Sequence, residues 1–123
     1  MEAKDRILVV DDEYTFRTLL STELEEEGYR VFSAGDGDEA IGILRTRSFD
    51  LVLLDNKMPN VDGDEVLKYV KANYPGTKVI MLTGSSDLQD AVGYKVLGAD
   101  HLISKPFDLA GLLVTIKCIL SSD

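Results

Sequence analysis

Short apolar runs alternate along the chain with longer segments of helical spacing, and this alternation limits the fold more than any other feature. The runs are rich in Val, Ile and Leu, and they occupy residues 7–10, 29–34, 51–54, 78–83 and 101–104. Continuous apolar strands between amphipathic helices are typical of a parallel sheet covered on both faces. With right-handed crossovers, the five repeats of strand and helix predict an α/β, doubly wound sheet in a single domain.

The segments between the runs carry apolar residues three and four positions apart, which is the spacing of one helix face. In the first segment these residues are Phe16, Leu19, Leu20 and Leu24, and Gly28 ends the helix. The other faces contain Ala40, Ile41 and Leu44; Val66, Leu67 and Val70; Leu88, Ala91 and Val92; and Leu109, Leu112, Leu113, Ile116 and Leu120. Asp108, and either Asp36 or Asp38, stand where side chains cap helix starts.

Charge and composition exclude several classes of protein. The 123 residues carry 22 acids against 13 bases, a net charge of −9, which repels nucleic-acid backbones and anionic membranes. No apolar segment approaches the roughly 20 residues of a membrane span. Cys118 is the only cysteine, which fits a reducing compartment, and we expect it to pack near the apolar stripe of the last helix. We therefore expect a cytoplasmic protein that binds neither nucleic acid directly nor membranes.

Polar residues follow four of the five apolar runs. They are Asp11 and Asp12 after the first run, Asp55 after the third, Thr83 and Gly84 at the end of the fourth, and Lys105 after the fifth. Ligands of doubly wound sheets bind at the carboxyl ends of the strands, where these residues converge. Converging carboxylates need a cation, and oxygen ligands select a hard ion such as Mg²⁺. A carboxylate can also attack phosphorus, so the pattern predicts a metal-assisted phospho-acceptor.

These motifs resemble the receiver domain of two-component response regulators. The resemblance rests on Asp11-Asp12 after "ILVV", Asp55 in "LVLLDNKMPNVDG", Thr83-Gly84 after "VIML", and "KPF" at 105–107. It covers essentially the whole chain, so we expect one receiver domain over residues 1–123. The resemblance implies a flavodoxin-like sheet with strand order 2-1-3-4-5 and five helices.

The same resemblance implies a role for each site residue. Asp55 would accept a phosphoryl group from a phosphohistidine of a histidine kinase or a histidine phosphotransfer protein. Mg²⁺ would bind Asp11, Asp12, Asp55 and the backbone carbonyl of Lys57. The domain would catalyse only its own phosphorylation and dephosphorylation, and so would not be a conventional enzyme.

Other residues would bind the phosphoryl group or respond to it. Lys105 would pair with the phosphoryl oxygens, together with the hydroxyl of Thr83 and the amide of Gly84. The side chains of Lys57 and Ser85 would tune the lifetime of the phosphate. Gly63 would shape the preceding loop by adopting backbone angles denied to other residues.

The output of the domain would be a changed surface. Its fourth helix, fifth strand and fifth helix would meet a second copy, as a homodimer, or an effector. At the switch position, where receivers usually carry tyrosine or phenylalanine, this chain has Leu102, so we expect the loop at 84–89 to carry more of the response. His101, the only histidine, is expected at the surface.

Three alternatives fit the sequence less well. A phosphatase or phosphotransferase of small substrates would need a cap domain, for which the chain has no length. A mononucleotide-binding module would need a glycine- or hydroxyl-rich loop after the first strand, where this chain has "DDEY". A receiver that has lost phosphorylation would not keep every key residue. Both a stand-alone regulator and a piece of a longer protein remain open, and we favour the piece.

Overall fold

Five parallel strands form the middle layer of the structure. They are β1 (Arg6–Val10), β2 (Arg30–Ala34), β3 (Leu51–Asp55), β4 (Lys78–Thr83) and β5 (His101–Ser104). The computed structural model describes residues 5–56, 58, 62–84, 88–105 and 107–121. The strands follow the order β2-β1-β3-β4-β5 across the sheet, and all their pairings are parallel. The predicted doubly wound sheet and its strand order are therefore confirmed.

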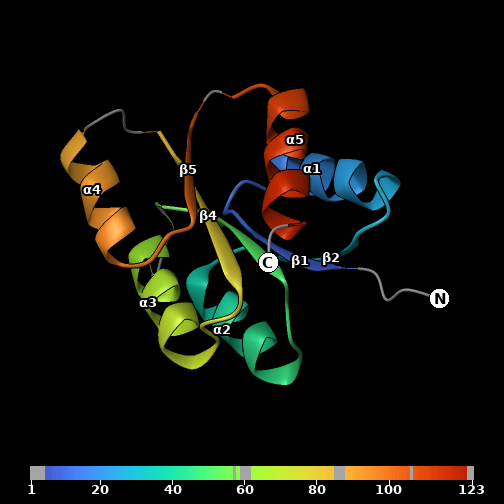
Figure 1. The fold of residues 1–123 in the computed structure, drawn as a ribbon. Helices are drawn as coiled ribbons and strands as arrows, with labels where there is room; N and C mark the ends of the chain where they lie inside the picture. The colour runs from blue at the N-terminus through green and yellow to red at the C-terminus, as the bar shows by residue number, and fades with distance from the viewer. Residues whose placement is uncertain (1–4, 57, 59–61, 85–87, 106, 122–123) are drawn as a thin grey trace.

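Five helices cover the two faces of this sheet. They are α1 (Tyr14–Glu26), α2 (Gly37–Thr46), α3 (Gly63–Asn73), α4 (Leu88–Val96) and α5 (Leu109–Leu120). Figure 1 shows α1 and α5 together on one side of the sheet, and α2, α3 and α4 on the other. Within the part of the chain that the structure describes, each helix is too short or too polar to cross a bilayer.

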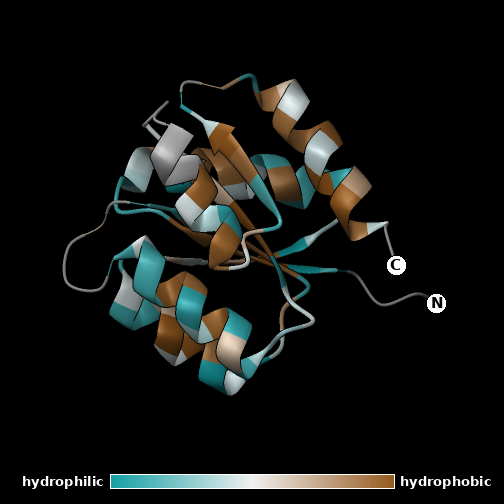
Figure 2. Cartoon of the chain, turned by 60° about the vertical axis from the view of Figure 1, so that its left-hand side comes forward, coloured by the Kyte–Doolittle hydropathy of each residue, from teal (hydrophilic) through white to brown (hydrophobic). Residues whose placement is uncertain are grey.

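The sheet separates two apolar cores, because successive side chains of a strand point to opposite faces. In β1, Leu8 and Val10 pack towards α2 and α3, whereas Ile7 and Val9 pack towards α1 and α5. The central strand β3 is buried along its whole length. Figure 2 shows the hydrophobic colour running along the central strands and α5. Each fully buried leucine of β3 stabilises the fold by about 2 kcal/mol, so the position of this strand is firmly determined.

The predicted helix ends are also found. Gly28 and Gly98 have φ angles of 101° and 103°, in the left-handed region that favours glycine. The side chain of Asp36 accepts a hydrogen bond from the Glu39 amide at 2.8 Å, and that of Asp108 accepts one from Gly111 at 3.3 Å. Of the two candidates for the second helix, Asp36 is thus the cap.

Three side chains expected to pack inside lie at the surface instead. Leu19 is 56% exposed and Val92 is 55% exposed. Cys118 is exposed as well, so its expected packing role is wrong. Because each residue turns a helix by about 100°, Leu19 points well away from Leu20 and Leu24, which face the core. His101 is exposed, as expected.

A half-buried ion pair joins α3 to the start of β5. Asp100 Oδ2 accepts hydrogen bonds from Lys71 Nζ and from the Val79 amide, each at 2.8 Å. Lys71 Nζ also donates to the carbonyl oxygen of Thr77 at 2.9 Å. One carboxylate therefore links a helix and two neighbouring strand segments.

Replacing this carboxylate should lower stability in a graded way. We expect Asp100→Ala to lower the free energy of unfolding by about 2 kcal/mol, since it leaves the Val79 amide and the Lys71 ammonium without their acceptor. Asp100→Asn keeps an acceptor for the amide and should cost about 1 kcal/mol. Urea unfolding followed by circular dichroism measures both values. Equal losses in the two variants would contradict this account.

Candidate functional site

Three carboxylates meet at the carboxyl-terminal edge of the sheet. Ligand oxygens of Asp11, Asp12 and Asp55 all lie within 4.8 Å of one another. Asp11 is 1% exposed and Asp55 is 7% exposed, whereas Asp12 faces solvent. The structure thus brings together all three of the carboxylates that the sequence nominated, from the ends of β1 and β3.

The register of the sheet explains why these side chains converge. Val10 pairs with Leu54 across β1 and β3, so the next residue of each strand, Asp11 and Asp55, reaches the same level. Asp55 in turn pairs with Leu82 of β4, which places Thr83 one step beyond it. Parallel strands in this register place their terminal side chains along one edge.

Asp11 is held in place by its neighbours on both sides. Its Oδ1 accepts a hydrogen bond from the Glu13 amide at 2.9 Å, and its own amide donates to the carbonyl oxygen of Ala34 at 3.2 Å. Arg17 Nη1 donates to the Asp11 carbonyl oxygen at 2.7 Å. Sequence reasoning missed Arg17, although its place six residues after Asp11, one turn into α1, is a usable signal.

Lys105 spans the carboxylates from the end of β5. Its Nζ lies 3.1 Å from Asp11 Oδ2 and 3.6 Å from Asp55 Oδ1. Its backbone amide donates to the carbonyl oxygen of Thr83 at 2.7 Å, which fixes the start of the side chain. The ammonium also lies 5.1 Å from the centre of the Phe16 ring. One positive charge therefore offsets part of the repulsion between two buried carboxylates.

Of the remaining residues that the sequence nominated, three lie in the described part of the chain and two do not. Thr83 is buried at the end of β4, and Gly84 follows it at the surface. Leu102 is half-buried and packs against the core that includes Tyr94. The predictions for Lys57 and Ser85 lie outside the described residues.

Gly63 is needed at this edge, but for a different reason from the one expected. Its φ angle is not in the left-handed region, so the expectation of unusual backbone angles is wrong. A Cβ atom there would lie only 2.3 Å from the Asp55 carbonyl oxygen and 2.8 Å from Asn56 Cα. The Gly63 amide donates to the Asn56 carbonyl oxygen at 3.3 Å. The requirement is close approach of α3 to the residue that follows β3 and to Asp55 itself.

A hollow opens beside the carboxylates. It has a volume of about 420 Å³ and is lined by Glu13, Phe16, Lys105 and Phe107. The rings of Phe16 and Phe107 meet edge to face, with their centres 5.7 Å apart. Lys105 therefore lines this hollow, and its Nζ also pairs with Asp11 and Asp55 of the acidic cluster.

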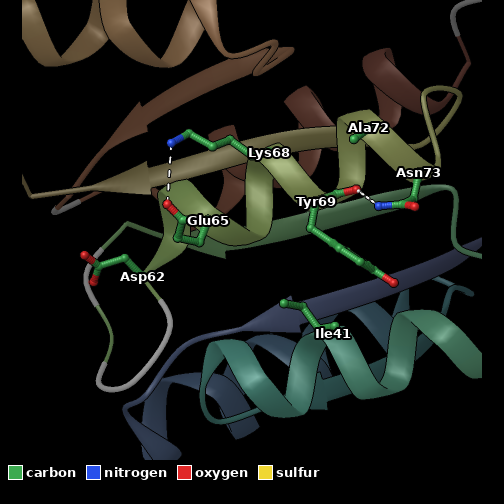
Figure 3. Close-up of a pocket in the computed structure, with 7 residues that line it drawn as sticks. All are labelled: Ile41, Asp62, Glu65, Lys68, Tyr69, Ala72 and Asn73. Carbon is green, nitrogen blue, oxygen red and sulfur yellow. Dashed lines mark hydrogen bonds and ion pairs between the residues drawn. The ribbon is translucent and has the colours of Figure 1, made fainter.

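A second hollow lies away from the acidic cluster, between α2 and α3. It has a volume of about 630 Å³, and Figure 3 shows Tyr69 of α3 reaching across it towards Ile41 of α2. On its rim Lys68 Nζ pairs with Glu65 Oε1 at 3.4 Å. The hydroxyl of Tyr74, and then Arg45, hold the pKa of Tyr69 below its usual value. None of the three converging aspartates lines this hollow, so the strand edge remains the candidate site.

Comparison with protein families gives a match over nearly the whole chain. Residues 7–117 match the family model described as the response regulator receiver domain. The chain is 39% identical over 113 residues to sporulation initiation phosphotransferase F of Bacillus subtilis, covering 92% of this chain and 91% of that protein. It is 41% identical over 117 residues, 95% of this chain, to the probable transcriptional regulator ycf27 of Porphyridium aerugineum.

Solved structures agree with this match. A CheY-like response regulator receiver domain protein from Methanospirillum hungatei superposes with a TM-score of 0.92 at 36% identity, covering 96% of this chain and 94% of that one. The chain spans about half the length of several longer relatives that it matches, among them 48% of the ycf27 protein of Porphyridium aerugineum and 47% of that of Guillardia theta. The resemblance to these longer relatives therefore concerns one part of each protein.

Proposed function

Since the chain belongs to the response regulator receiver domain family, we propose that Asp55 is the residue through which it receives a phosphoryl group. Phosphorylation of an aspartate by a kinase is the general function of this family, whose members are signalling domains. The observation that supports the proposal for Asp55 is its place within 4.8 Å of the Asp11 and Asp12 oxygens, with Lys105 Nζ at 3.6 Å.

The proposed reaction is an in-line transfer to a carboxylate oxygen. An oxygen of Asp55 attacks phosphorus, a new O–P bond forms, and the P–N bond to the donor imidazole breaks. The electron pair of that bond goes to the imidazole nitrogen, which takes up a proton. Lys105 supplies positive charge to the phosphoryl oxygens, and Thr83 and the Gly84 amide supply hydrogen bonds to them.

The donor set at this edge fits magnesium. Receiver domains generally bind Mg²⁺ at an acidic pocket, and here three carboxylates offer oxygen ligands within 4.8 Å of one another. We propose that Asp11, Asp12 and Asp55 hold the ion, together with the backbone carbonyl of Lys57. When bound, the ion would offset the charge of the carboxylates and of the phosphoryl oxygens.

Magnesium should therefore stabilise the chain and be required for its phosphorylation. At a hundred times its Kd, Mg²⁺ should raise the free energy of unfolding by about 2.7 kcal/mol and raise Tm. The rise should disappear in Asp11→Asn and persist in Asp36→Asn, which alters a helix cap but keeps a capping side chain. Thermal unfolding measures this effect. Removal of Mg²⁺ by a chelator should also prevent any gain of phosphoryl mass from acetyl phosphate, and an unchanged gain would contradict the metal assignment.

The partners and lifetime of the phosphorylated state form the rest of the proposal. Receiver domains interact with histidine kinases or phosphotransfer proteins, and we propose such a donor for this chain. A water molecule would later attack phosphorus and return the electron pair to Asp55, at a rate tuned by Lys57 and Ser85. Output would pass through α4, β5 and α5 to a second copy or an effector, with Leu102 at the switch position.

Membership of the family also supports proposals for the cellular location and the bounds of the domain. Response regulators generally act in the cytoplasm, and we propose the same for this chain. The net charge of −9 argues against direct binding of nucleic acid or membrane by this domain. We propose that residues 1–123 form one receiver domain.

A further inference from the structure

A buried hydrogen bond connects the residue after Asp55 to helix α4. The side-chain amide of Asn56 donates from Nδ2 to the hydroxyl oxygen of Tyr94 at 3.1 Å. Asn56 is 7% exposed and Tyr94 is 8% exposed, so water competes little for this bond. The two residues are 38 positions apart in the chain.

The backbone of Asn56 is fixed independently of this bond. Its amide donates to the carbonyl oxygen of Leu82 in β4 at 3.1 Å, and its carbonyl oxygen accepts from the Gly63 amide at 3.3 Å. Asn56 therefore ties the end of β3 to β4 and to the start of α3 through its backbone. Its side chain adds the connection to α4, and Asp55 is its covalent neighbour.

Tyr94 is the point at which the described part of α4 enters the core. Among the described side chains of this helix, at residues 92–96, it alone is buried. Val92 and Val96, one helical turn apart, are exposed on the outer face. The Tyr94 carbonyl oxygen also accepts a hydrogen bond from the Ala99 amide at 3.0 Å, which fixes the end of the helix. We therefore expect a displacement of Tyr94 to move α4 as a rigid body.

We propose that Tyr94 is a positioning residue, whose hydroxyl orients Asn56 beside the acceptor and transmits the state of Asp55 to α4. The proposal rests on the role proposed above for Asp55. A phosphoryl group on Asp55 adds bulk and negative charge one residue from Asn56, and the Tyr94 hydroxyl is the polar group of α4 that the Asn56 amide contacts. Leu102 has no hydrogen-bonding side chain, so it cannot form a polar contact of this kind.

The test removes one hydroxyl and follows two readouts. Tyr94→Phe keeps the buried ring and should slow phosphorylation by acetyl phosphate and Mg²⁺ about fivefold, the effect of one lost hydrogen bond. Hydrogen exchange of the amides at 92–97 is compared with and without beryllium fluoride, a stable mimic of the phosphoryl group. The mimic should change the exchange of these amides in the wild-type chain, and the change should be lost in Tyr94→Phe.

A matched control removes a phenol hydroxyl elsewhere. Tyr69 of α3 also has hydrogen-bonding partners, with Arg45 Nε at 3.4 Å and the Tyr74 hydroxyl at 3.5 Å, and these lie in α2 and at the end of α3. Tyr69→Phe should therefore leave the phosphorylation rate and the exchange response of α4 unchanged. Adding Asn56→Ala to Tyr94→Phe should slow the reaction no further than Asn56→Ala alone, since both remove the same bond.

The outcomes separate this proposal from the one on which it rests. If both effects appear in Tyr94→Phe and neither appears in Tyr69→Phe, the positioning role is supported. Any other combination overturns it, including a slower reaction with an unchanged α4 response, which would indicate a purely structural bond. If the wild-type chain itself gains no phosphoryl group on Asp55, the proposed function fails instead.

Discussion

Asp55→Asn is expected to abolish phosphorylation by acetyl phosphate, whereas the wild-type chain gains one phosphoryl group in the presence of Mg²⁺. The amide of asparagine is a poor nucleophile. The substitution also removes one of the three carboxylates that lie within 4.8 Å of one another. Intact-mass spectrometry after incubation measures the gain directly. This is the largest effect expected of any single substitution, because no chemistry remains to replace the lost oxygen nucleophile.

The matched control for this experiment is Asp108→Asn. Asp108 caps α5 through a hydrogen bond from the Gly111 amide at 3.3 Å, and asparagine is an equally good cap. This variant changes the same functional group at the surface and should be phosphorylated like the wild-type chain. Equal phosphoryl gain in Asp55→Asn and Asp108→Asn would refute the assignment of Asp55.

Gly63→Ala is expected to lower both stability and phosphorylation, although it adds only a methyl group. The new Cβ would lie 2.3 Å from the Asp55 carbonyl oxygen and 2.8 Å from Asn56 Cα, so the backbone itself must shift. Overpacking of this kind costs about 3 kcal/mol. A displaced Asp55 should also react at least about tenfold more slowly, since attack requires correct placement of the nucleophile. Urea unfolding and the initial rate of phosphoryl gain measure the two effects.

Gly42→Ala provides the comparison within another helix. Gly42 lies in α2, and a Cβ atom there would meet nothing within 4 Å. Alanine favours the helix over glycine by about 1 kcal/mol, so this variant should be slightly more stable and fully active. If Gly63→Ala behaved like Gly42→Ala, close approach to Asp55 could not be the reason for glycine at position 63.

Much of the fold could be predicted because the three central strands β1, β3 and β4 are short and buried on both faces. The run at 51–54 is continuous in Leu and Val, and it became β3, buried from Leu51 to Asp55. A strand buried on both faces must be apolar on both sides, so its continuous apolar run can be recognised without knowing which strands lie beside it. The acids that follow such strands could also be assigned to a common edge. The reason is that parallel strands end on the same side of the sheet.

The predictions that proved wrong concern side-chain burial and backbone contacts, which depend on how the elements pack. Leu19 and Val92 were assigned to buried faces from helical spacing alone, yet both are more than half exposed. Spacing defines a stripe on a helix, but how widely the sheet covers that stripe depends on how the helix is docked. The burial of Cys118 was wrongly predicted for the same reason, since its side chain is exposed. Gly63 was correctly singled out and wrongly explained, because a sequence records the glycine and not the carbonyl oxygen that approaches it.

The sequence by itself determined the sheet, its helices and the identity of the polar residues at the carboxyl-terminal edge of the sheet, because these depend on local pattern and on the direction of the chain. Only the tertiary structure decided how those residues are held. Lys105 at the Asp11 carboxylate and Asn56 at the Tyr94 hydroxyl are contacts between distant segments. Their partners are selected by the register of the strands and by the docking of the helices. Such contacts leave no periodic signal in the chain, since each depends on one distance that forms only when the whole domain has folded.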